Sequence, residues 1–282
     1  MPIARPVLTP EALIRRFVPL LALFAATGSS ASSSEARTLR VCADPNNLPF
    51  SNSREEGFEN HIARLLASEM ERPLQYAWYA QRRGFIRNTL RAELCDVIVG
   101  IPASVELVLP TRPYYRSTYV FVHRADAPFT IRSLNDSILR RVKVGVQFVG
   151  DDGANTPAVH ALNKRGIVRN IVGFSIYGDY REPNPPARIV EAVAKGTVDV
   201  AIVWGPLAGY FAAKQAVPLT IVPVSPQVDL PFLPFVFDIA MGVRRADTAF
   251  RQQLDDVLVR RRDSMDSILA AFHVPRTDRR QP

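Results

Sequence analysis

The chain alternates apolar, strand-like segments with amphipathic, helix-like segments, and this alternation constrains its fold more than any other feature. Strand-like runs over residues 38–44, 73–80 and 95–100 are separated by helix-like runs over 57–70 and 82–94. In the helix-like runs, apolar residues recur every three or four positions. Because a β-α-β-α-β order is most simply joined by right-handed crossovers, these residues predict a parallel sheet covered by helices.

A second unit with the same alternation follows a strand predicted over 117–124. It comprises strands predicted over 142–150, 170–178 and 198–205 and helices predicted over 156–166, 186–197 and 206–215. Five prolines between 217 and 235 predict a crossover segment there, neither a helix nor a central strand. A strand over 235–245 and a single helix over roughly 248–272, whose apolar face is expected to pack on the sheet, complete the chain.

Two α/β units joined by two chain crossings predict a bilobal protein. We expect one lobe over 38–122 plus 222–274, the other over 123–221, and a flexible tail over 275–282. Strand carboxyl ends and helix amino ends converge between the lobes, so the cleft is the expected ligand site. The segment 148–157 precedes a helix but lacks the lysine of a phosphate loop and carries two aspartates, so we interpret it as a turn.

Residues 1–36 have the organisation of an export signal. Arg15 and Arg16 precede a short apolar run, and small residues follow, with candidate cleavage sites after Ala31 and Ala36. The RRF triplet resembles a twin-arginine signal only faintly, which favours the general secretory route. No later run has the length of a transmembrane helix. We therefore expect a periplasmic protein whose mature chain has no membrane span.

Export to an oxidising compartment determines how the two cysteines are interpreted. Cys42 and Cys95 are part of no CxxC or Cys/His cluster, so a disulfide is favoured over a metal or catalytic site. Cys42 lies near the end of the first predicted strand and Cys95 at the start of the third. A bond between them requires a staggered register or a Cys95 close to a turn, with Cα atoms about 5.5 Å apart.

Charge and histidine content exclude several classes of function. The formal net charge is +8, with 35 lysines and arginines, mostly arginines scattered along the chain. Such a surface attracts acidic partners at long range, but nucleic-acid binding needs a basic stripe with aromatic residues, so we expect no nucleic acid. The four histidines are far apart and form no HExxH or Ser/His/Asp pattern. We expect no metal, no cofactor and no catalytic triad.

Several long motifs resemble one known family, in the order in which that family carries them. They are LRVCADPNNLPFSN, GFENHIARLLASEM, CDVIVGIPA, ELVLPTRPYYRSTYVFV and FDIAMGVRR. The motifs are similar to the quinoprotein-dehydrogenase-associated binding proteins of the MoxJ/XoxJ type, a branch of the family 3 periplasmic solute-binding proteins. The similarity covers nearly all of residues 38–274. It implies a type II periplasmic-binding-protein fold, two parallel-sheet lobes joined by two hinge crossings, and a PQQ-dependent methanol dehydrogenase as partner.

The chain departs from the amino-acid receptors of this superfamily at both charged ligand contacts. In those receptors an arginine nine residues before the PYY proline binds the ligand carboxylate, and Ser104 occupies that position here. An aspartate that binds the ligand amine is replaced by Trp204. A buried zwitterion without charged partners is strongly destabilised, so a free amino acid is not the expected ligand. Compensation by Arg112, Arg116 or Asp152 is the alternative.

The residues expected at the cleft are aromatic or polar. They are Asn46, Phe50, Ser104, Tyr114, Tyr115, Gln147, Asp151 and Trp204. Such a set can stack on and hydrogen-bond an aromatic ligand, but the same rings can equally fill the interface between the lobes.

We expect an accessory protein of a PQQ-dependent methanol dehydrogenase system, acting in maturation, activation or partner binding, and not an enzyme. The first alternative is the solute receptor of an ABC importer for a small organic ligand other than a free amino acid. A second alternative is a cleft dehydratase, since some proteins of this fold are dehydratases. Its candidate acid and base are Asp44, Glu59 and Asp151.

Overall fold

The computed structural model describes residues 37–149, 155–175 and 180–277. The predicted export signal, Asp151 and Asp152 lie outside the described residues, as do residues 278–282 of the predicted tail. Among the helices in the described ranges, none combines the length and the apolarity needed to cross a bilayer.

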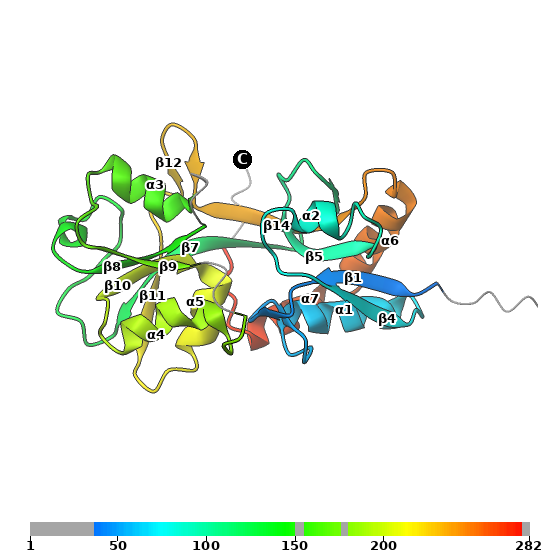
Figure 1. Ribbon diagram of the computed structural model, residues 1–282, viewed down its shortest axis with the longest axis horizontal. Coiled ribbons are helices and arrows are strands. Elements are labelled where there is room, and N and C mark those ends of the chain that lie inside the picture. The colour runs from blue at the N-terminus through cyan, green and yellow to red at the C-terminus, as the bar shows by residue number, and fades with distance from the viewer. Residues whose placement is uncertain (1–36, 150–154, 176–179, 278–282) are drawn as a thin grey trace, which may run out of the picture. The chain divides into compact units, whose positions relative to one another are not determined.

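Ten strands of the described chain form one curled, mixed β-sheet (Figure 1). They are β1 (Leu39–Ala43), β4 (Leu74–Trp78), β5 (Val97–Pro102), β6 (Leu109–Pro110), β7 (Tyr115–Arg124), β8 (Val144–Phe148), β9 (Ile171–Ser175), β10 (Val200–Trp204), β11 (Leu219–Pro223) and β14 (Val236–Val243). The order is β4-β1-β5-β14-β7-β10-β8-β9, with β6 beside β14 and β11 beside β7. Two separate hairpins are formed by β2 (Asn46–Asn47) with β3 (Ser51–Asn52) and by β12 (Val228–Asp229) with β13 (Leu233–Pro234).

The fold is the predicted bilobal α/β fold, with a parallel core in each lobe. In the first lobe β1 pairs in parallel with β4 and β5, and in the second β8 pairs in parallel with β9 and β10. Next to these cores, β14 runs antiparallel to β5, and β7 runs antiparallel to β10. β14 enters the first lobe from the second, and β7 enters the second lobe from the first. Each therefore runs antiparallel to neighbouring strands that local β-α-β connections join in parallel.

The two chain crossings lie side by side as a hydrogen-bonded pair. β7 pairs with β14 from Tyr115 to Thr118 and with β10 from Tyr119 to His123. At the change of partner, the Tyr119 amide and the Thr118 hydroxyl both donate to the Phe235 carbonyl oxygen, at 2.8 and 3.0 Å. These are the two predicted hinge crossings. The exact lobe boundaries stay a prediction.

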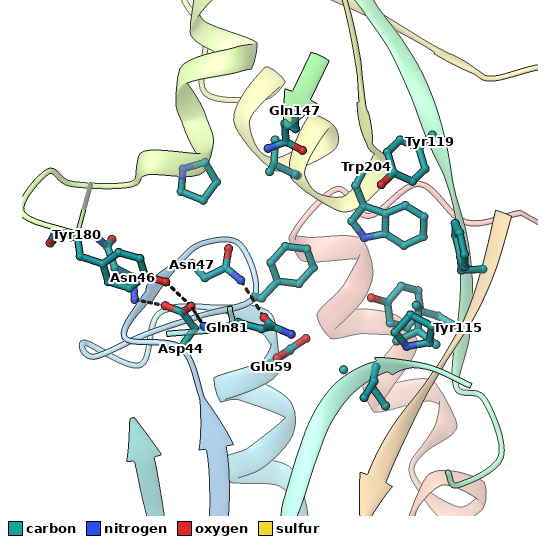
Figure 2. Close-up of a pocket in the computed structure, with 18 residues that line it drawn as sticks. Asp44, Asn46, Asn47, Glu59, Gln81, Tyr115, Tyr119, Gln147, Tyr180 and Trp204 are labelled. Carbon is teal, nitrogen blue, oxygen red and sulfur yellow. Dashed lines mark hydrogen bonds between the residues drawn. The ribbon is translucent and has the colours of Figure 1, made fainter. Parts of the chain in front are cut away.

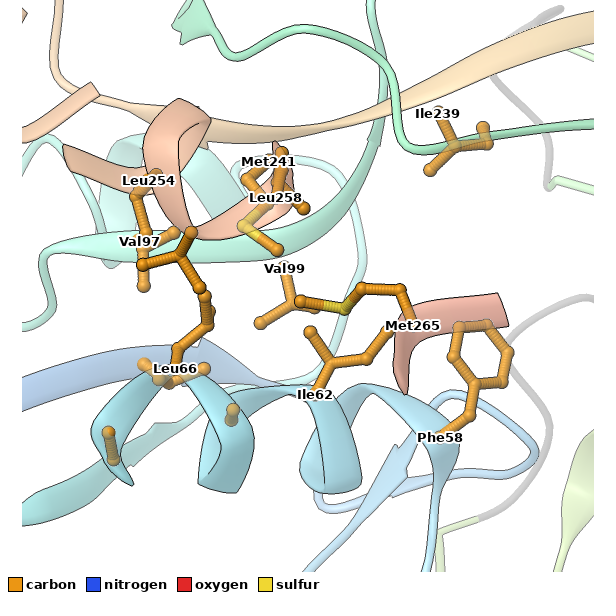
Figure 3. Close-up of a cluster of buried hydrophobic side chains, with 14 of the residues drawn as sticks. Phe58, Ile62, Leu66, Val97, Val99, Ile239, Met241, Leu254, Leu258 and Met265 are labelled. Carbon is orange, nitrogen blue, oxygen red and sulfur yellow. The ribbon is translucent and has the colours of Figure 1, made fainter. Parts of the chain in front are cut away.

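Three helices cover one face of the sheet in the first lobe. They are α1 (Phe58–Glu69), α6 (Thr248–Arg260) and α7 (Arg262–Ala271). Phe58, Ile62 and Leu66 recur every four residues along α1 and are fully buried in the core, where Figure 3 shows them with Met265 of α7. Burying a side chain of this size contributes about 1.5–3 kcal/mol. This apolar face holds α1 on the sheet and fixes where its amino end lies.

In the second lobe, helices cover both faces of the sheet. They are α3 (Pro157–Lys164), α4 (Arg188–Ala194) and α5 (Gly205–Ala212), with short 3-10 helices η1 (Ser137–Arg140) and η2 (Pro185–Ala187). Figure 1 shows α3 on one side of this sheet and α4 and α5 on the other. Along β10, Val200 and Ile202 belong to the core under α3, whereas Ala201 and Val203 belong to the core under α4 and α5. Successive side chains of a strand point to opposite faces, so a strand buried on both faces is apolar throughout.

Two predicted helices are shorter than the sequence pattern indicates. The helix predicted over 82–94 is reduced to α2 (Phe85–Asn88), and the Thr89 hydroxyl donates to the Phe85 carbonyl at its end. Turns replace the remainder, with Glu93 in the left-handed region. The single helix predicted over 248–272 is divided at Arg261 into α6 and α7, which lets both segments follow the curvature of the core.

The proline-rich crossover contains a strand that was not predicted. β11 pairs antiparallel with β7, with Pro218 just before it and Pro223 as its last residue. Proline removes a ladder donor but is tolerated at the ends of edge strands. Proline content alone therefore excluded a central strand here but not an edge strand.

The predicted disulfide between Cys42 and Cys95 is present, and its Cα atoms are 5.4 Å apart. Cys42 lies opposite Ile98 in the register of β1 and β5, so Cys95 lies in the turn before β5. This is the turn-proximal arrangement expected from the sequence. The bond is buried with Phe85 and Leu90 in a small core on the side of the sheet away from α1.

Candidate functional site

A cavity of about 380 Å³ lies between the lobes, and its lining comes from both of them (Figure 2). The first lobe contributes the loop after β1, the amino end of α1 and the end of β5. The second contributes the ends of β8 and β10 and the segment 180–186. The crossing strands β7 and β14 form the wall at the hinge. The lining residues are Asp44, Asn46, Asn47, Phe50, Glu59, Gln81, Gly100, Ile101, Pro102, Tyr115, Tyr119, Gln147, Tyr180, Pro186, Trp204, Leu207, Phe237 and Ile239.

Five of the eight predicted cleft residues line this cavity. They are Asn46, Phe50, Tyr115, Gln147 and Trp204. They come from four separate segments of the chain, because Asn46 and Phe50 share the loop after β1, and the two lobes bring these segments together.

The other three predicted residues are not part of the described lining. Ser104 lies exposed in the turn that follows β5, so its hydroxyl is not available to the cavity. The Tyr114 hydroxyl donates to the Val99 carbonyl oxygen at 3.2 Å, and its ring faces a different hollow on the protein. Asp151 lies outside the described residues.

The loop after β1 forms a rigid wall because Asp44 organises it. The Asp44 carboxylate accepts hydrogen bonds from the backbone amides of Asn46 (2.8 Å) and Gln81 (2.6 Å). The Ser51 hydroxyl accepts from the Asp44 amide and donates to its carbonyl, at 3.0 and 2.8 Å. These bonds close the β2–β3 hairpin, and Phe50, in the turn between the two strands, packs its ring edge-on against Phe58.

Tyr180 of the second lobe is bonded to this wall of the first. Its hydroxyl donates to the Asp44 carboxylate at 2.5 Å, and the Arg82 guanidinium lies 4.8 Å from its ring centroid. The Asn46 amide also donates to the Glu182 carbonyl oxygen at 2.9 Å. Burial and the hydrogen bond to Asp44 raise the pKa of Tyr180, so it remains a donor at neutral pH. The segment 180–186 therefore closes one side of the cavity.

The hinge wall of the cavity is aromatic. Trp204 ends β10, and its ring centroid lies 5.5 Å from that of Tyr119 on β7 and 5.7 Å from that of Phe237 on β14. Burial raises the pKa of Tyr119. The sequence left open whether Trp204 binds a ligand or packs between the lobes. In the structure its ring packs against the two crossing strands and the residue also lines the cavity, so packing is shown and ligand binding stays a prediction.

Glu59 and Gln147 bring unsatisfied polar groups to the cavity from opposite lobes (Figure 2). Glu59 is the second residue of α1, and its carboxyl group lies against Gly100, where a Cβ atom would overlap it. Among the described residues, neither the Glu59 carboxyl nor the Gln147 side-chain amide has a hydrogen-bond partner. Burial, and secondarily the charge of Asp44, raise the pKa of Glu59 to about 8.

The raised pKa of Glu59 predicts that stability falls with rising pH. A carboxyl group with a pKa of about 8 when folded and about 4.5 when unfolded binds more protons in the native state, so its contribution is lost between these pH values. We expect the stability of the protein relative to its Glu59→Gln variant to decline across this interval, by at most about 1.4 kcal/mol per pH unit. Urea unfolding of both proteins at fixed pH values measures this, and parallel curves would contradict it.

The sequence indicated Glu59 only as a candidate catalytic acid or base, and it gave no signal for Tyr119, Tyr180 or Phe237. The signal for Glu59 is its place at the start of a helix that points at the cleft. Tyr119 and Phe237 lie on the two crossing strands, which pair only in the folded protein.

The described residues contain no group of three His, Cys, Asp or Glu side chains placed to hold a metal ion.

Two lobes on a curled mixed sheet, two adjacent crossings and a cavity between the lobes define a type II periplasmic binding protein. The chain is 33% identical to Protein MoxJ of Methylorubrum extorquens over 88% of its own length and 84% of that protein. It belongs to the MoxJ family. No protein-family profile matches the chain.

Two solved structures are similar to this one. MxaJ from Methlophaga aminisulfidivorans superposes with a TM-score of 0.74 at 25% identity, covering 85% of this chain and 100% of MxaJ. The periplasmic binding protein XoxJ from Methylobacterium extorquens superposes with a TM-score of 0.69 at 31% identity, covering 86% of this chain and 100% of XoxJ.

Proposed function

We propose that the protein is a periplasmic, solute-binding-protein-like accessory protein of a PQQ-dependent methanol dehydrogenase, exported by the general secretory route. Its family membership over almost the whole described chain carries this proposal. The likeness to MxaJ and XoxJ, each covered completely, supports it. In this role the protein acts through a binding surface in the maturation, activation or binding of the dehydrogenase, and it needs neither a cofactor nor catalysis.

The β12–β13 hairpin offers an apolar surface for such a partner. At its tip, Leu230 is 72% exposed and Phe232 is 90% exposed. The base of the hairpin is anchored, since both terminal nitrogens of Arg165 bond the Asp229 carboxylate at 2.8 Å. Large apolar side chains on an anchored, exposed tip are typical of protein contact sites. The Lys164 ammonium, 3.7 Å from Asp229, adds positive charge suited to an acidic partner.

Co-purification tests both the role and the surface. We expect the tagged mature protein to retain the dehydrogenase from methanol-grown cells. We expect Phe232→Ser to reduce the recovered dehydrogenase at least about tenfold, because centrally placed aromatic contacts typically carry 2 kcal/mol or more of binding energy. Leu107→Ser, at an apolar residue 57% exposed in the first lobe, is the matched control and should recover it fully. Absence of the dehydrogenase from the wild-type eluate contradicts the role.

The interlobe cavity favours a second candidate, the solute receptor of an ABC importer for a small organic ligand other than a free amino acid. A solute at 100 times its dissociation constant stabilises a binding protein by about 2.7 kcal/mol. A screen of small solutes by thermal unfolding, run beside the co-purification, separates the two candidates. A rise in unfolding temperature caused by a solute, with no dehydrogenase recovered in the co-purification, favours the receptor.

The dehydratase is a further alternative, since two of its candidate catalytic residues, Asp44 and Glu59, line the cavity. Its test is an assay for elimination of water from an organic acid.

A further inference from the structure

We propose that the interlobe cavity binds a small organic cation that carries no carboxylate, such as a quaternary ammonium compound, with Glu59 as its counter-ion and aromatic rings around it. This site does not depend on the accessory role, because it concerns the cavity and not the outer surface.

The charge of the lining selects a cation. Although the chain has a formal net charge of +8, none of the described lining residues is lysine or arginine, and two of them, Asp44 and Glu59, are acidic. Asp44 is already bonded by the Asn46 and Gln81 amides and the Tyr180 hydroxyl. Glu59 is the carboxyl group left to meet a ligand. A ligand carboxylate would be buried beside two acids with no basic residue among the described lining, which disfavours amino acids and other anions.

The aromatic rings of the cavity suit a cation, and their orientations are set by packing. Phe50 and Tyr115 both pack edge-on against the buried Phe58, with centroids 5.4 and 6.2 Å away. Trp204, at the end of β10 in the second lobe, is held by ring contacts with Tyr119 and Phe237 of the two crossing strands. A cation over an aromatic face is attracted by the negative electrostatic potential of the ring, and more strongly where water is excluded. Because these rings are held before a ligand enters, little side-chain entropy is lost on binding.

Glu59 makes binding depend on pH. The charge of Asp44 acts on Glu59, and burial together with the charge of Glu59 raises the pKa of Tyr76, Tyr114 and Tyr115; none of these four groups is basic. With a pKa of about 8, the Glu59 carboxyl of the free protein is mostly protonated at neutral pH. A permanent cation binds the ionised carboxylate, so binding releases a proton and the affinity rises with pH. Gln147, across the cavity, can hydrogen-bond a hydroxyl or ether group of the ligand.

Titration calorimetry of the mature protein at pH 8.5 tests the site with four probes. Choline and tetramethylammonium carry the charge, 3,3-dimethylbutan-1-ol is the neutral isostere of choline, and glycine betaine adds a carboxylate. We expect saturable binding of at least one of the two cations, and at least about tenfold weaker binding of the isostere and of betaine, which corresponds to 1.4 kcal/mol.

Two further comparisons assign the binding to Glu59. Glu59→Gln keeps the shape and removes the charge, so we expect it to weaken cation binding at least about tenfold. Glu69→Gln, which removes a charge at the other end of α1, where Glu69 pairs with Arg261, should leave binding unchanged. For the wild type, binding at pH 6 should be about 75-fold weaker than at pH 8.5, because Glu59 is about 1% ionised at pH 6 and about 75% ionised at pH 8.5.

Several results would overturn the proposal. They are the absence of saturable binding by both cations at millimolar concentration, binding of the isostere as tight as that of choline, and equal cation binding by the wild type and Glu59→Gln. The pH comparison uses the wild type alone, so the proposal remains testable if the variant does not fold. No dehydrogenase is present in these experiments, so their failure leaves the accessory role untouched.

Discussion

Replacing Cys42 and Cys95 together by alanine is expected to lower the free energy of unfolding by about 4 kcal/mol. The disulfide closes a loop with a sequence separation of 53 residues, and in the chain-entropy model opening such a loop restores about that much freedom to the unfolded chain. Both cysteines are buried with Phe85 and Leu90, so the substitution also loosens a small core.

Guanidinium chloride unfolding of the oxidised wild type, the reduced wild type and the double variant measures this effect. We expect the reduced and doubly substituted proteins to unfold at similar denaturant concentrations, well below the oxidised protein. If all three unfold at the same concentration, the disulfide contributes nothing to stability.

Asp96→Asn is expected to cost about 3 kcal/mol, because removing one partner of a buried ion pair leaves charge without compensation. The Asp96 side chain is only 7% exposed and accepts from the Arg40 guanidinium at 2.6 and 3.0 Å. The guanidinium of Arg244, the residue after β14, also donates a hydrogen bond to the Asp96 carboxylate, at 3.0 Å. Without the carboxylate, the Arg40 and Arg244 guanidinium groups remain close together beside the start of β5, although Arg244 keeps its ion pair with Asp247.

The same contacts predict how stability depends on acid. Burial acts to raise the pKa of Asp96, but the hydrogen bonds from Arg40 and Arg244 outweigh it, and the pKa is lowered. The stabilisation by Asp96 is therefore complete above the unfolded pKa, near 4, and is lost as pH falls below it toward the folded value. Asp96→Asn should lack this loss when unfolding is measured at a series of pH values.

A surface ion pair gives the matched control for Asp96. Asp126 bonds Arg124 at 2.7 and 2.8 Å but is mostly exposed. Exposed ion pairs contribute about 0–1 kcal/mol, so Asp126→Asn should change stability little. An equally small effect of Asp96→Asn would show that the buried network does not support the fold.

The disulfide and the Asp96 network both connect β1 to the segment before β5. Arg40 and Cys42 lie on β1, and Cys95 and Asp96 are the two residues that directly precede β5. The loop after β1 carries Asp44 into the cavity wall. We therefore expect loss of either the disulfide or the Asp96 ion pairs to loosen the cavity wall as well as the first lobe.

Local pattern predicted most of the secondary structure, because burial on one or two faces leaves a period in the sequence. This period predicted the apolar face of α1, with Phe58, Ile62 and Leu66. The continuous apolar run predicted β10 in the same way. The pattern was misleading where the chain turns within an apolar stretch, as after Asn88, and where an edge strand tolerates proline, as in β11. For β11 the decisive contacts are those with β7, a segment distant in sequence.

The sequence by itself determined the bilobal α/β class and the disulfide, which follow from periodicity and from the cysteine count of an exported chain, and its resemblance to a known family led to five of the cavity residues. Only the tertiary structure decided the character of the cavity. It placed Glu59 opposite Gln147, bonded Tyr180 to Asp44 across the lobes and turned Ser104 and Tyr114 away. The physical reason is that charge balance and hydrogen-bond satisfaction depend on which distant groups meet, and no local period in the sequence records that.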